Sequence, residues 1–382
     1  MSFIIACVLL CGLAATSCTG QRALYSGPFV VGTTPVDVLN EVSGMAQSAE
    51  QSVVWMINDS GDEPMLYAIH VRDGLLSKHR IQGASNIDWE DLAIEGSNIY
   101  VADIGDNNAK RKNITIYRFP APALRENTTV DSSIVDRFVL AYPDGPRDAE
   151  ALLVDPLTQE IVIVTKRESR SRIYSCNGLT TSSAELTYRG ELSSNLITSA
   201  TVSADGRKIL LKNYHKVWEW QRDTSEPLWK VLLREGRRIT YGPELQGEAI
   251  CFDKGDYGYY TTSEREDGGD PAPINYYLVE SDGLFSAAKL GRDIKLPQIE
   301  IEAIFSKRGR YLLRYTLPEV ERVKIILYNE GMFKVLTIAE DTAESGVQER
   351  EIDLSKFPSG SYAVLLTTPR AQASCQIEHV FR

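Results

Sequence analysis

The chain has 382 residues, a formal net charge of -11 at pH 7, and 43% hydrophobic and 24% charged residues. These proportions are those of an ordinary folded, water-soluble protein, and the length allows two or three domains. The acidic balance argues against nucleic acid as a partner, because neutralising phosphates requires a basic face, and it is compatible with cation binding.

The N-terminal segment, residues 1–21, is predicted to be a signal peptide. Phe3 to Ala15 form an apolar run too short to span a bilayer, and small residues follow it. The sequence Ala15-Thr16-Ser17-Cys18 resembles the lipobox of bacterial lipoproteins, in which cleavage precedes a cysteine that then carries lipid. We therefore expect an extracytoplasmic protein, with Cys18 as the lipidation site and outer-membrane attachment through it. Cleavage near this point without lipid is the alternative.

Residues 22–298 hold a repeated unit that predicts a β-propeller. In each copy a small or acidic pair opens a short apolar strand, a Gly or Asn break follows, and a second apolar strand ends in polar residues. Short strands recurring at about 50 residues are typical of propeller blades, and we expect five or six blades of four strands. The copies are anchored on Ser43, Glu90, Glu150, Ala200 and Glu248.

Both ends of this repeated region carry further strand signals. Phe29-Val30-Val31 precedes the first copy and is expected to complete the last blade, which would close the ring and leave no exposed edge. Glu300-Ile301-Glu302 continues the repeat register and would start a sixth blade. Equally, Ala303-Ile304-Phe305 suits the lead-in of a second domain, which is the interpretation we favour.

Acidic residues at the start of the repeats predict a metal site. Positions two apart on a strand share one face, so two rungs of side chains are expected to encircle the channel. One rung holds Glu41, Asp88, Asp148, Thr198 and Gln246; the other holds Ser43, Glu90, Glu150, Ala200 and Glu248. Carboxylate ligands without His or Cys suit calcium better than zinc. The predicted calcium ligands are Asp88, Glu90, Asp148, Glu150 and Glu248. Alternatively, inner-strand acids bond the backbone amides of neighbouring blades.

The ends of the second strands predict a ligand-binding mouth for a small molecule or a glycan. A basic pair beside acids is suited to hold an anion that also contacts the cation. Asp at a strand end also makes Asx-turns, which is the structural alternative. The candidate ligand-binding residues are Asp59, Asp103, Asp106, Lys166, Arg167, Asn213, Tyr214 and Glu264.

Residues 37–280 resemble a family of uncharacterised secreted bacterial proteins. The matching motifs include Asn58-Asp-Ser-Gly-Asp62, Asp88-Trp-Glu-Asp-Leu92, Asp103-Ile-Gly-Asp-Asn107, Asp148-Ala-Glu-Ala-Leu152 and Gln246-Gly-Glu-Ala-Ile250. A looser similarity exists to calcium-dependent β-propeller phytases and esterase-like phytase domains, in which channel acids hold calcium ions that position phosphate and water. That similarity implies equivalent roles for Asp88, Glu90, Asp91, Asp148, Glu150, Glu248, Lys166 and Arg167. The fourth copy, with Thr198 and Ala200, lacks its acids.

Residues 299–382 alternate like the strands of an Ig-like β-sandwich. They resemble the type A sorting domain of the type IX secretion system, which implies the secretion machinery as a partner and delivery to the cell surface or medium. The alternative is a plain Ig-like module beside the propeller. The matching elements are Tyr315-Thr-Leu-Pro318, Leu327-Tyr-Asn329, Gly346, Asp353-Leu-Ser355 and Ser359-Gly-Ser-Tyr362.

Three classes of function remain open from the sequence. The chain contains no nucleophile elbow, P-loop or dinucleotide fingerprint, and no Cys or His spacing typical of zinc. The favoured class is a binding or scaffold propeller. A calcium-dependent hydrolase of phosphate or other esters and a glycan-active enzyme are the alternatives.

Overall fold

The structure is a computed structural model that describes residues 24–242, 244–265, 269–280, 300–307, 309–329, 334–368 and 372–380. The predicted signal peptide with Cys18, and the predicted domain boundary after residue 298, lie outside these residues. Within them the regular secondary structure is almost entirely strand, and helix is confined to α1 (Leu228–Leu232) and the 3-10 turn Ser132–Ile134. No helix in this part of the chain is long and apolar enough to cross a membrane. The predicted all-β class is confirmed.

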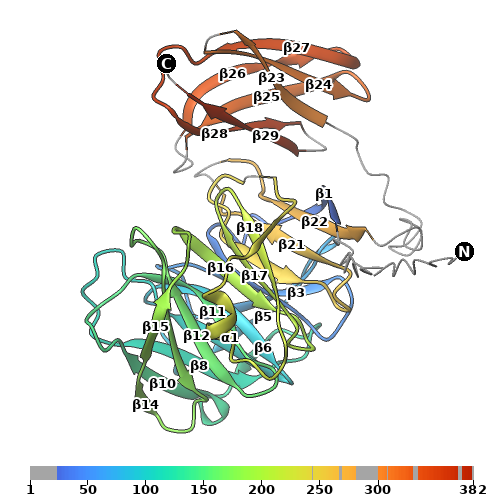
Figure 1. Ribbon diagram of the computed structural model, residues 1–382. Coiled ribbons are helices and arrows are strands. Elements are labelled where there is room, and N and C mark those ends of the chain that lie inside the picture. The colour runs from blue at the N-terminus through green and yellow to red at the C-terminus, as the bar shows by residue number, and fades with distance from the viewer. Residues whose placement is uncertain are drawn as a thin grey trace, which may run out of the picture.

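Five sheets make up residues 24–280 (Figure 1). The first contains β2 (Val42–Gln47), β3 (Val53–Asn58), β4 (Met65–His70), β5 (Gly74–Ile81) and β9 (Thr128–Val130). The second contains β6 (Trp89–Glu95), β7 (Asn98–Asp103), β8 (Ile114–Pro120), β10 (Asp136–Ala141) and β14 (Ser183–Glu185). The third contains β11 (Ala149–Val154), β12 (Glu160–Thr165), β13 (Arg172–Asn177) and β15 (Thr187–Glu191).

The fourth sheet contains β16 (Ile197–Val202), β17 (Lys208–Asn213), β18 (Val217–Gln221) and β19 (Arg237–Ile239). The fifth contains β20 (Ala249–Phe252), β21 (Gly258–Thr262), β22 (Pro273–Glu280) and β1 (Leu24–Thr33). Strand β1 pairs antiparallel with β22, and Phe29 lies opposite Tyr276. The N-terminal strand therefore completes the last sheet, as the sequence predicted.

The sheets are arranged radially, as in a β-propeller. Their first strands, β2, β6, β11, β16 and β20, contact one another in that order, and β20 returns to β2. Buried apolar clusters fill the gaps between neighbouring sheets: Trp55 packs with Trp89 between the first and second, and Met56 packs with Tyr260 between the fifth and first. Hydrophobic burial thus holds each sheet against both neighbours.

Two short strands link neighbouring sheets at their outer edges. β9 comes from the connection between β8 and β10 of the second sheet, yet it pairs parallel with β5 of the first. In the same way, β14 lies between two strands of the third sheet in the sequence and pairs parallel with β10 of the second. The longest interval between repeats, from Glu90 to Glu150, contains β9. Its pairing covers the outer edge of β5, whose backbone groups would otherwise be unpaired.

A β-bulge interrupts the start of four inner strands. The register shifts between Val42 and Gly44, and at the corresponding places in β6, β11 and β16. The extra residues at these bulges are Ser43, Glu90, Glu150 and Thr198. A bulge changes the direction of a side chain without changing the rest of the strand. Thr198, rather than Ala200, is therefore the structural equivalent of Glu90, so the fourth repeat was misaligned by two residues in the sequence prediction.

The C-terminal residues form two further sheets packed face to face. One contains β23 (Glu300–Lys307), β24 (Arg310–Leu317) and β27 (Gly346–Asp353). The other contains β26 (Lys334–Ala343), β25 (Glu321–Tyr328), β28 (Gly360–Thr367) and β29 (Gln372–His379). A buried core that includes Leu313, Ile325 and Val364 lies between them. Glu300-Ile301-Glu302 belongs to β23 and pairs with β24, so these residues extend this sandwich and not the propeller.

The sandwich contacts one end of the fourth and fifth sheets (Figure 1). Ile326, Tyr328 and Leu365 pack against Tyr214 and Leu245. The side-chain amide of Gln376 also donates to the carbonyl of His215, at 3.1 Å. This contact lies beside the polar ends of the second strands, which include Tyr214.

Candidate functional site

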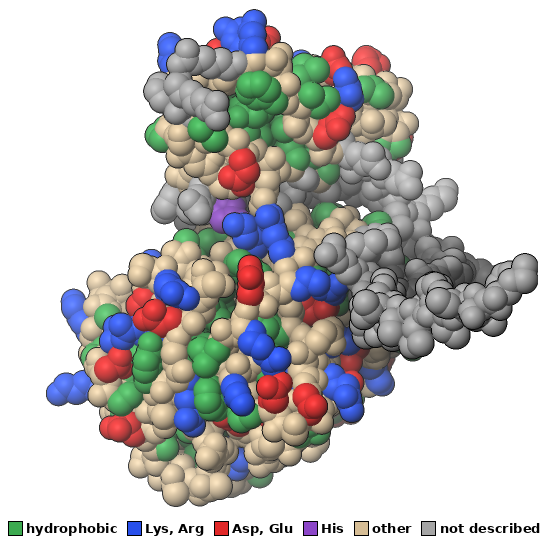
Figure 2. All heavy atoms as spheres, viewed as in Figure 1, with side chains coloured by type: hydrophobic (Ala, Val, Ile, Leu, Met, Phe, Trp, Pro, Cys, Tyr) green, Lys and Arg blue, Asp and Glu red, His purple; other side chains and the backbone are tan. Residues whose placement is uncertain are grey.

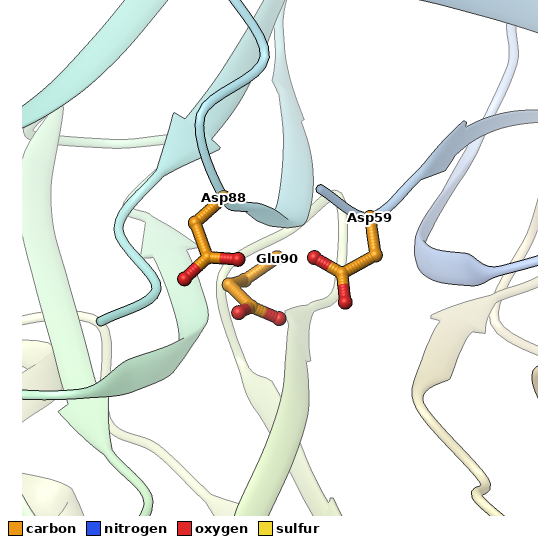
Figure 3. A group of neighbouring side chains, drawn as sticks. All are labelled: Asp59, Asp88 and Glu90. Atoms are coloured by element: carbon orange, nitrogen blue, oxygen red, sulfur yellow. The ribbon is translucent and has the colours of Figure 1, made fainter. Parts of the chain in front are cut away.

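Carboxylates from three sheets converge near the axis of the propeller. The carboxylate oxygens of Asp59, Asp88 and Glu90 offer three ligand atoms within 4.8 Å of one another, and Glu90, Asp148 and Glu150 offer a second such group. Figure 3 shows the first three side chains directed toward a common space, with Asp59 following β3 and the other two at the start of β6. Asp59, which the sequence placed among the ligand-binding residues, is therefore part of the carboxylate cluster.

The backbone of Gly105 approaches this cluster closely. A β-carbon at this position would overlap the carboxylate of Glu90 and lie 2.6 Å from the carboxylate of Asp88. Glycine is the residue that permits so close an approach, because it has no side chain. The backbone of Gly105 therefore lies directly against the carboxylates of Glu90 and Asp88, and a side chain at position 105 would collide with them.

Glu150 and Glu248 share the ammonium group of Lys166. The Lys166 Nζ atom lies 2.5 Å from Glu150 Oε1 and 3.7 Å from Glu248 Oε1. Tyr214 donates its hydroxyl hydrogen to Glu248 Oε1, at 2.8 Å, and its ring lies 5.1 Å from the same ammonium. The Oε2 atoms of both glutamates are buried without a hydrogen-bond partner among the described residues. Such acceptors are costly to bury, and a cation or water at this position would satisfy them.

The remaining predicted mouth residues have partners within the protein. Asp103 pairs with Arg111, at 2.8 Å, and accepts a hydrogen bond from the amide of Asp88. Asp106 accepts from the amide of Arg111. Arg167 Nε lies 2.5 Å from Asp148 Oδ2, and the amide of Asp106 donates to Asp148 Oδ1.

Asn213 and Glu264 are also engaged. The Asn213 side-chain oxygen accepts from the amides of His215 and Lys216 and so closes the turn after β17. The carboxylate of Glu264 accepts from the side-chain amide of Gln246. Several mouth residues therefore organise loops, in agreement with the structural alternative considered for them.

Asp91 performs the structural role that was the alternative for inner-strand acids. Its carboxylate is fully buried and accepts hydrogen bonds from the amides of Leu92, Leu152 and Ala200 and from the hydroxyl of Ser199. These donors belong to the second, third and fourth sheets. The Asp91 carboxylate therefore links three sheets by hydrogen bonds, a role we call the tie between sheets. This role differs from that of the neighbouring metal candidates Asp88 and Glu90.

Sequence reasoning missed two charged groups near the cluster. Arg111 lies in the run Lys110-Arg111-Lys112, which resembles a solvated loop, yet it binds Asp103 and the carbonyl of Gly105. Lys212 is fully buried, and its Nζ atom lies 3.6 Å from Glu244 Oε2. Lys212 follows three apolar residues in β17, so its spacing gave no reason to distinguish it from other strand residues.

Burial and mutual repulsion raise the pKa values of several cluster acids. Burial raises the pKa of Glu90 well above its ordinary value, and the nearby charges of Glu150 and Asp59 act in the same direction. Burial likewise raises the pKa of Asp59 to about 7. The pKa of Glu264 rises to about 8, through burial and then through repulsion from Glu248 and Asp59. Removing this repulsion requires protons or a bound cation.

In chelating buffer, the melting temperature should fall as pH rises from 6.5 to 8. Asp59 and Glu264 have folded-state pKa values above their unfolded ones, so their stabilising contribution is present at low pH and is lost as pH passes through about 7 and about 8. Burial lowers the pKa values of His79 and His215 to about 4, and their opposing effect ends as pH passes the ordinary histidine value of about 6.5, at the lower edge of this window. Thermal unfolding of Glu264→Gln should show a smaller slope, and an equal slope would contradict the assignment.

Comparisons with known proteins leave the family open. No family model and no curated protein sequence matches the chain. Similar solved structures include Kuenenia stuttgartiensis hydrazine synthase, with 9% identity and a TM-score of 0.35 over 62% of this chain and 96% of that one. A chain of the nidogen–laminin complex has 14% identity and a TM-score of 0.35, over 58% of this chain and 72% of that one. The type IX secretion surface component PorZ of Porphyromonas gingivalis has 12% identity and a TM-score of 0.34, over 89% and 45%. Sequence identities and TM-scores this low support no inference about function. The propeller assignment rests on the sheet topology.

Proposed function

We propose that the chain is an extracytoplasmic binding or scaffold protein, built as a five-bladed β-propeller followed by an Ig-like sandwich, and that it holds calcium at the channel mouth. The observation that carries this proposal is the convergence of Asp59, Asp88, Glu90, Asp148 and Glu150 from three sheets. Their placement beside buried carboxylate oxygens without partners favours a ligand that supplies positive charge.

The donor set suits calcium. Calcium takes roughly six to eight oxygen ligands in flexible geometry. Asp59, Asp88 and Glu90 supply up to six carboxylate oxygens, and the backbone of Gly105 lies close beside two of these acids. Glu90 belongs to both groups of three carboxylates, the one with Asp59 and Asp88 and the one with Asp148 and Glu150. The ion is therefore expected to lie close to Glu90. We call these two groups the triads. Glu248 is expected to act through Lys166 and Tyr214, since it belongs to neither triad.

The charge arrangement favours binding over ester hydrolysis. A phosphoesterase that resembles the β-propeller phytases would need cationic groups directed at a phosphate. Lys166, Arg167 and Arg111 instead pair with Glu150, Asp148 and Asp103. These cations are already engaged by acidic side chains, so the calcium-dependent hydrolase is the weaker proposal.

The export proposal rests on the ends of the chain. The apolar N-terminal run followed by Cys18 supports export with lipid attachment. The sandwich formed by β23 to β29 is consistent with a module that the type IX secretion machinery recognises. Recognition by that machinery is proposed from the sequence motifs alone.

Millimolar calcium is expected to raise the melting temperature of residues 22–382, and a chelator should lower it. A ligand that binds only the folded state stabilises it by about 2.7 kcal/mol at a hundredfold excess over its Kd. The measurement is differential scanning fluorimetry with calcium, magnesium or chelator. The double variant Glu90→Gln with Glu150→Gln removes two proposed ligand groups and should lose the response.

A matched control is Glu340→Gln with Glu349→Gln, which removes the same charge from exposed positions on the sandwich. The control should respond to calcium as the unmodified protein does. A calcium response that persists in the Glu90 and Glu150 double variant, or that is absent from the unmodified protein, would rule out the proposed site.

A further inference from the structure

A second polar cavity lies where the sandwich meets the fourth sheet. It has a volume of about 750 Å³, within the range of small-molecule sites. Its lining includes Asn195, Lys216, Trp218 and Arg238 from the propeller and Ser361 from β28. Figure 2 shows basic and histidine side chains gathered at the narrow junction between the two parts of the molecule. None of these five residues belongs to the carboxylate cluster.

Two cations line the cavity together with an indole ring. Lys216 directly precedes β18 and is two residues from Trp218, which belongs to that strand. Arg238 of β19 is the antiparallel partner of Trp218, which makes the two side chains direct cross-strand neighbours. Trp218 and Lys216 are partly exposed, and Arg238 is exposed. Part of the Trp218 indole packs against the core between the third and fourth sheets, and its remaining surface lines the cavity with Lys216 and Arg238.

Neither charge is neutralised by an ion pair among the described residues. Arg238 donates to the side-chain oxygen of Gln376, which is neutral. The adjacent Arg237, by contrast, pairs with Glu219 at 2.6 Å. The closest acids are Glu235, which lines the cavity, and Glu378, whose carboxylate accepts from the hydroxyl of Ser361.

The charges of Lys216 and Arg238 also affect His215, which lines the same cavity. Burial, and after it these two charges, lowers the pKa of His215 to about 4. His215 is therefore neutral at physiological pH, and Lys216 and Arg238 supply the positive potential. In a chain of net charge -11, an unneutralised cationic pair at a cavity indicates an anionic ligand.

We infer that this cavity binds an acidic oligosaccharide. The apolar C–H face of a sugar ring packs on the exposed part of the Trp218 indole, since this buries apolar area on both partners. A carboxylate or sulfate on the same sugar accepts charge-assisted hydrogen bonds from the Arg238 guanidinium, and Lys216 adds a second positive charge. The amide of Asn195 and the hydroxyl of Ser361 are suited to sugar hydroxyls. The site is independent of the proposed calcium ion.

Calorimetric titration of the full chain tests this inference. The probes are a galacturonate tetrasaccharide, its methyl-esterified neutral counterpart and a sulfated tetrasaccharide, each in chelating buffer so that calcium cannot bridge protein and ligand. We expect binding of at least one acidic probe, with affinity at least tenfold above that for the neutral one and falling as salt increases. The two acidic probes distinguish a carboxylate from a sulfate ester as the recognised group.

Variants separate this cavity from other surfaces. Trp218→Ala and Arg238→Gln should each reduce the affinity about tenfold or more, and Trp218→Phe should retain part of it. Matched controls are Trp229→Ala and Arg189→Gln, because Arg189 stacks on Trp229 at 4.8 Å elsewhere on the propeller. These two controls should bind normally. Failure of both acidic probes to bind, equal affinity for the neutral probe, or unchanged binding in Arg238→Gln would overturn the inference.

Discussion

Replacing Asp91 by alanine is expected to destabilise the propeller by about 3–5 kcal/mol. The fully buried carboxylate accepts from the amides of Leu152 and Ala200, at 2.9 and 3.3 Å, and thereby joins the third and fourth sheets to the second. It also accepts from Ser199 Oγ, at 3.1 Å. The alanine variant leaves these donors buried without partners, and each lost partner adds a desolvation cost. Equilibrium unfolding in urea measures the change.

The asparagine variant distinguishes hydrogen bonding from charge. Burial raises the pKa of Asp91 well above its ordinary value, although four hydrogen bonds act in the opposite direction. Asp91→Asn keeps one acceptor oxygen and should therefore lose less stability than Asp91→Ala. Asp136→Ala, at an exposed acid paired with Arg118, should change stability by about 1 kcal/mol or less. An unchanged urea midpoint in Asp91→Ala would contradict the proposed tie.

Replacing Arg222 by alanine should also cost about 3–5 kcal/mol. The Arg222 Nη1 and Nη2 atoms lie 2.9 and 2.7 Å from the two carboxylate oxygens of Asp155, and both side chains are buried. Asp155 follows β11 and Arg222 follows β18, so this bidentate pair joins the third and fourth sheets. Removing one partner leaves the other charge buried and unpaired, which is more costly than losing the attraction alone.

A double-mutant cycle isolates this pair. Arg222→Ala combined with Asp155→Ala should cost less than the sum of the two single changes, because no unpaired charge remains. Burial acts to raise the pKa of Asp155, yet its hydrogen bonds with Arg222, Thr158 and Leu157 bring it below the ordinary value. Its contribution should therefore be present at neutral pH and lost as pH falls below about 4. Strictly additive costs in urea unfolding would show that the two residues act independently.

The architecture could be predicted because propeller strands are short, repeated and locally patterned. The acidic pairs at Asp88 and Glu90 and at Asp148 and Glu150 mark the start of inner strands, and the structure brings these residues together. Phe29 in the closing strand was also found, since a short apolar strand ahead of the first repeat has few other partners.

The details of the site depended on features that sequence spacing does not encode. Asp88, Glu90 and Asp91 lie within four positions, and only the bulge determines which of them face the cluster and which ties sheets together. The equivalent bulge in β16 places Thr198 in the position that the sequence alignment assigned to Ala200. Arg111 was missed because its function depends on a loop that folds back over β7.

The closure of the ring by β1 has a consequence for the order of events during synthesis. Leu24 pairs with Glu280, so the two halves of this contact are separated by ~250 residues of chain. During synthesis the ring of sheets cannot close until β22 has left the ribosome. Until then the backbone groups of β1 that pair with β22 remain unpaired. Contacts this distant in sequence slow folding. The N-terminal strand β1 is synthesised before the other propeller strands and is among the last to pair. A chaperone that binds the chain before β22 is available would therefore encounter β1 as an unpaired strand edge.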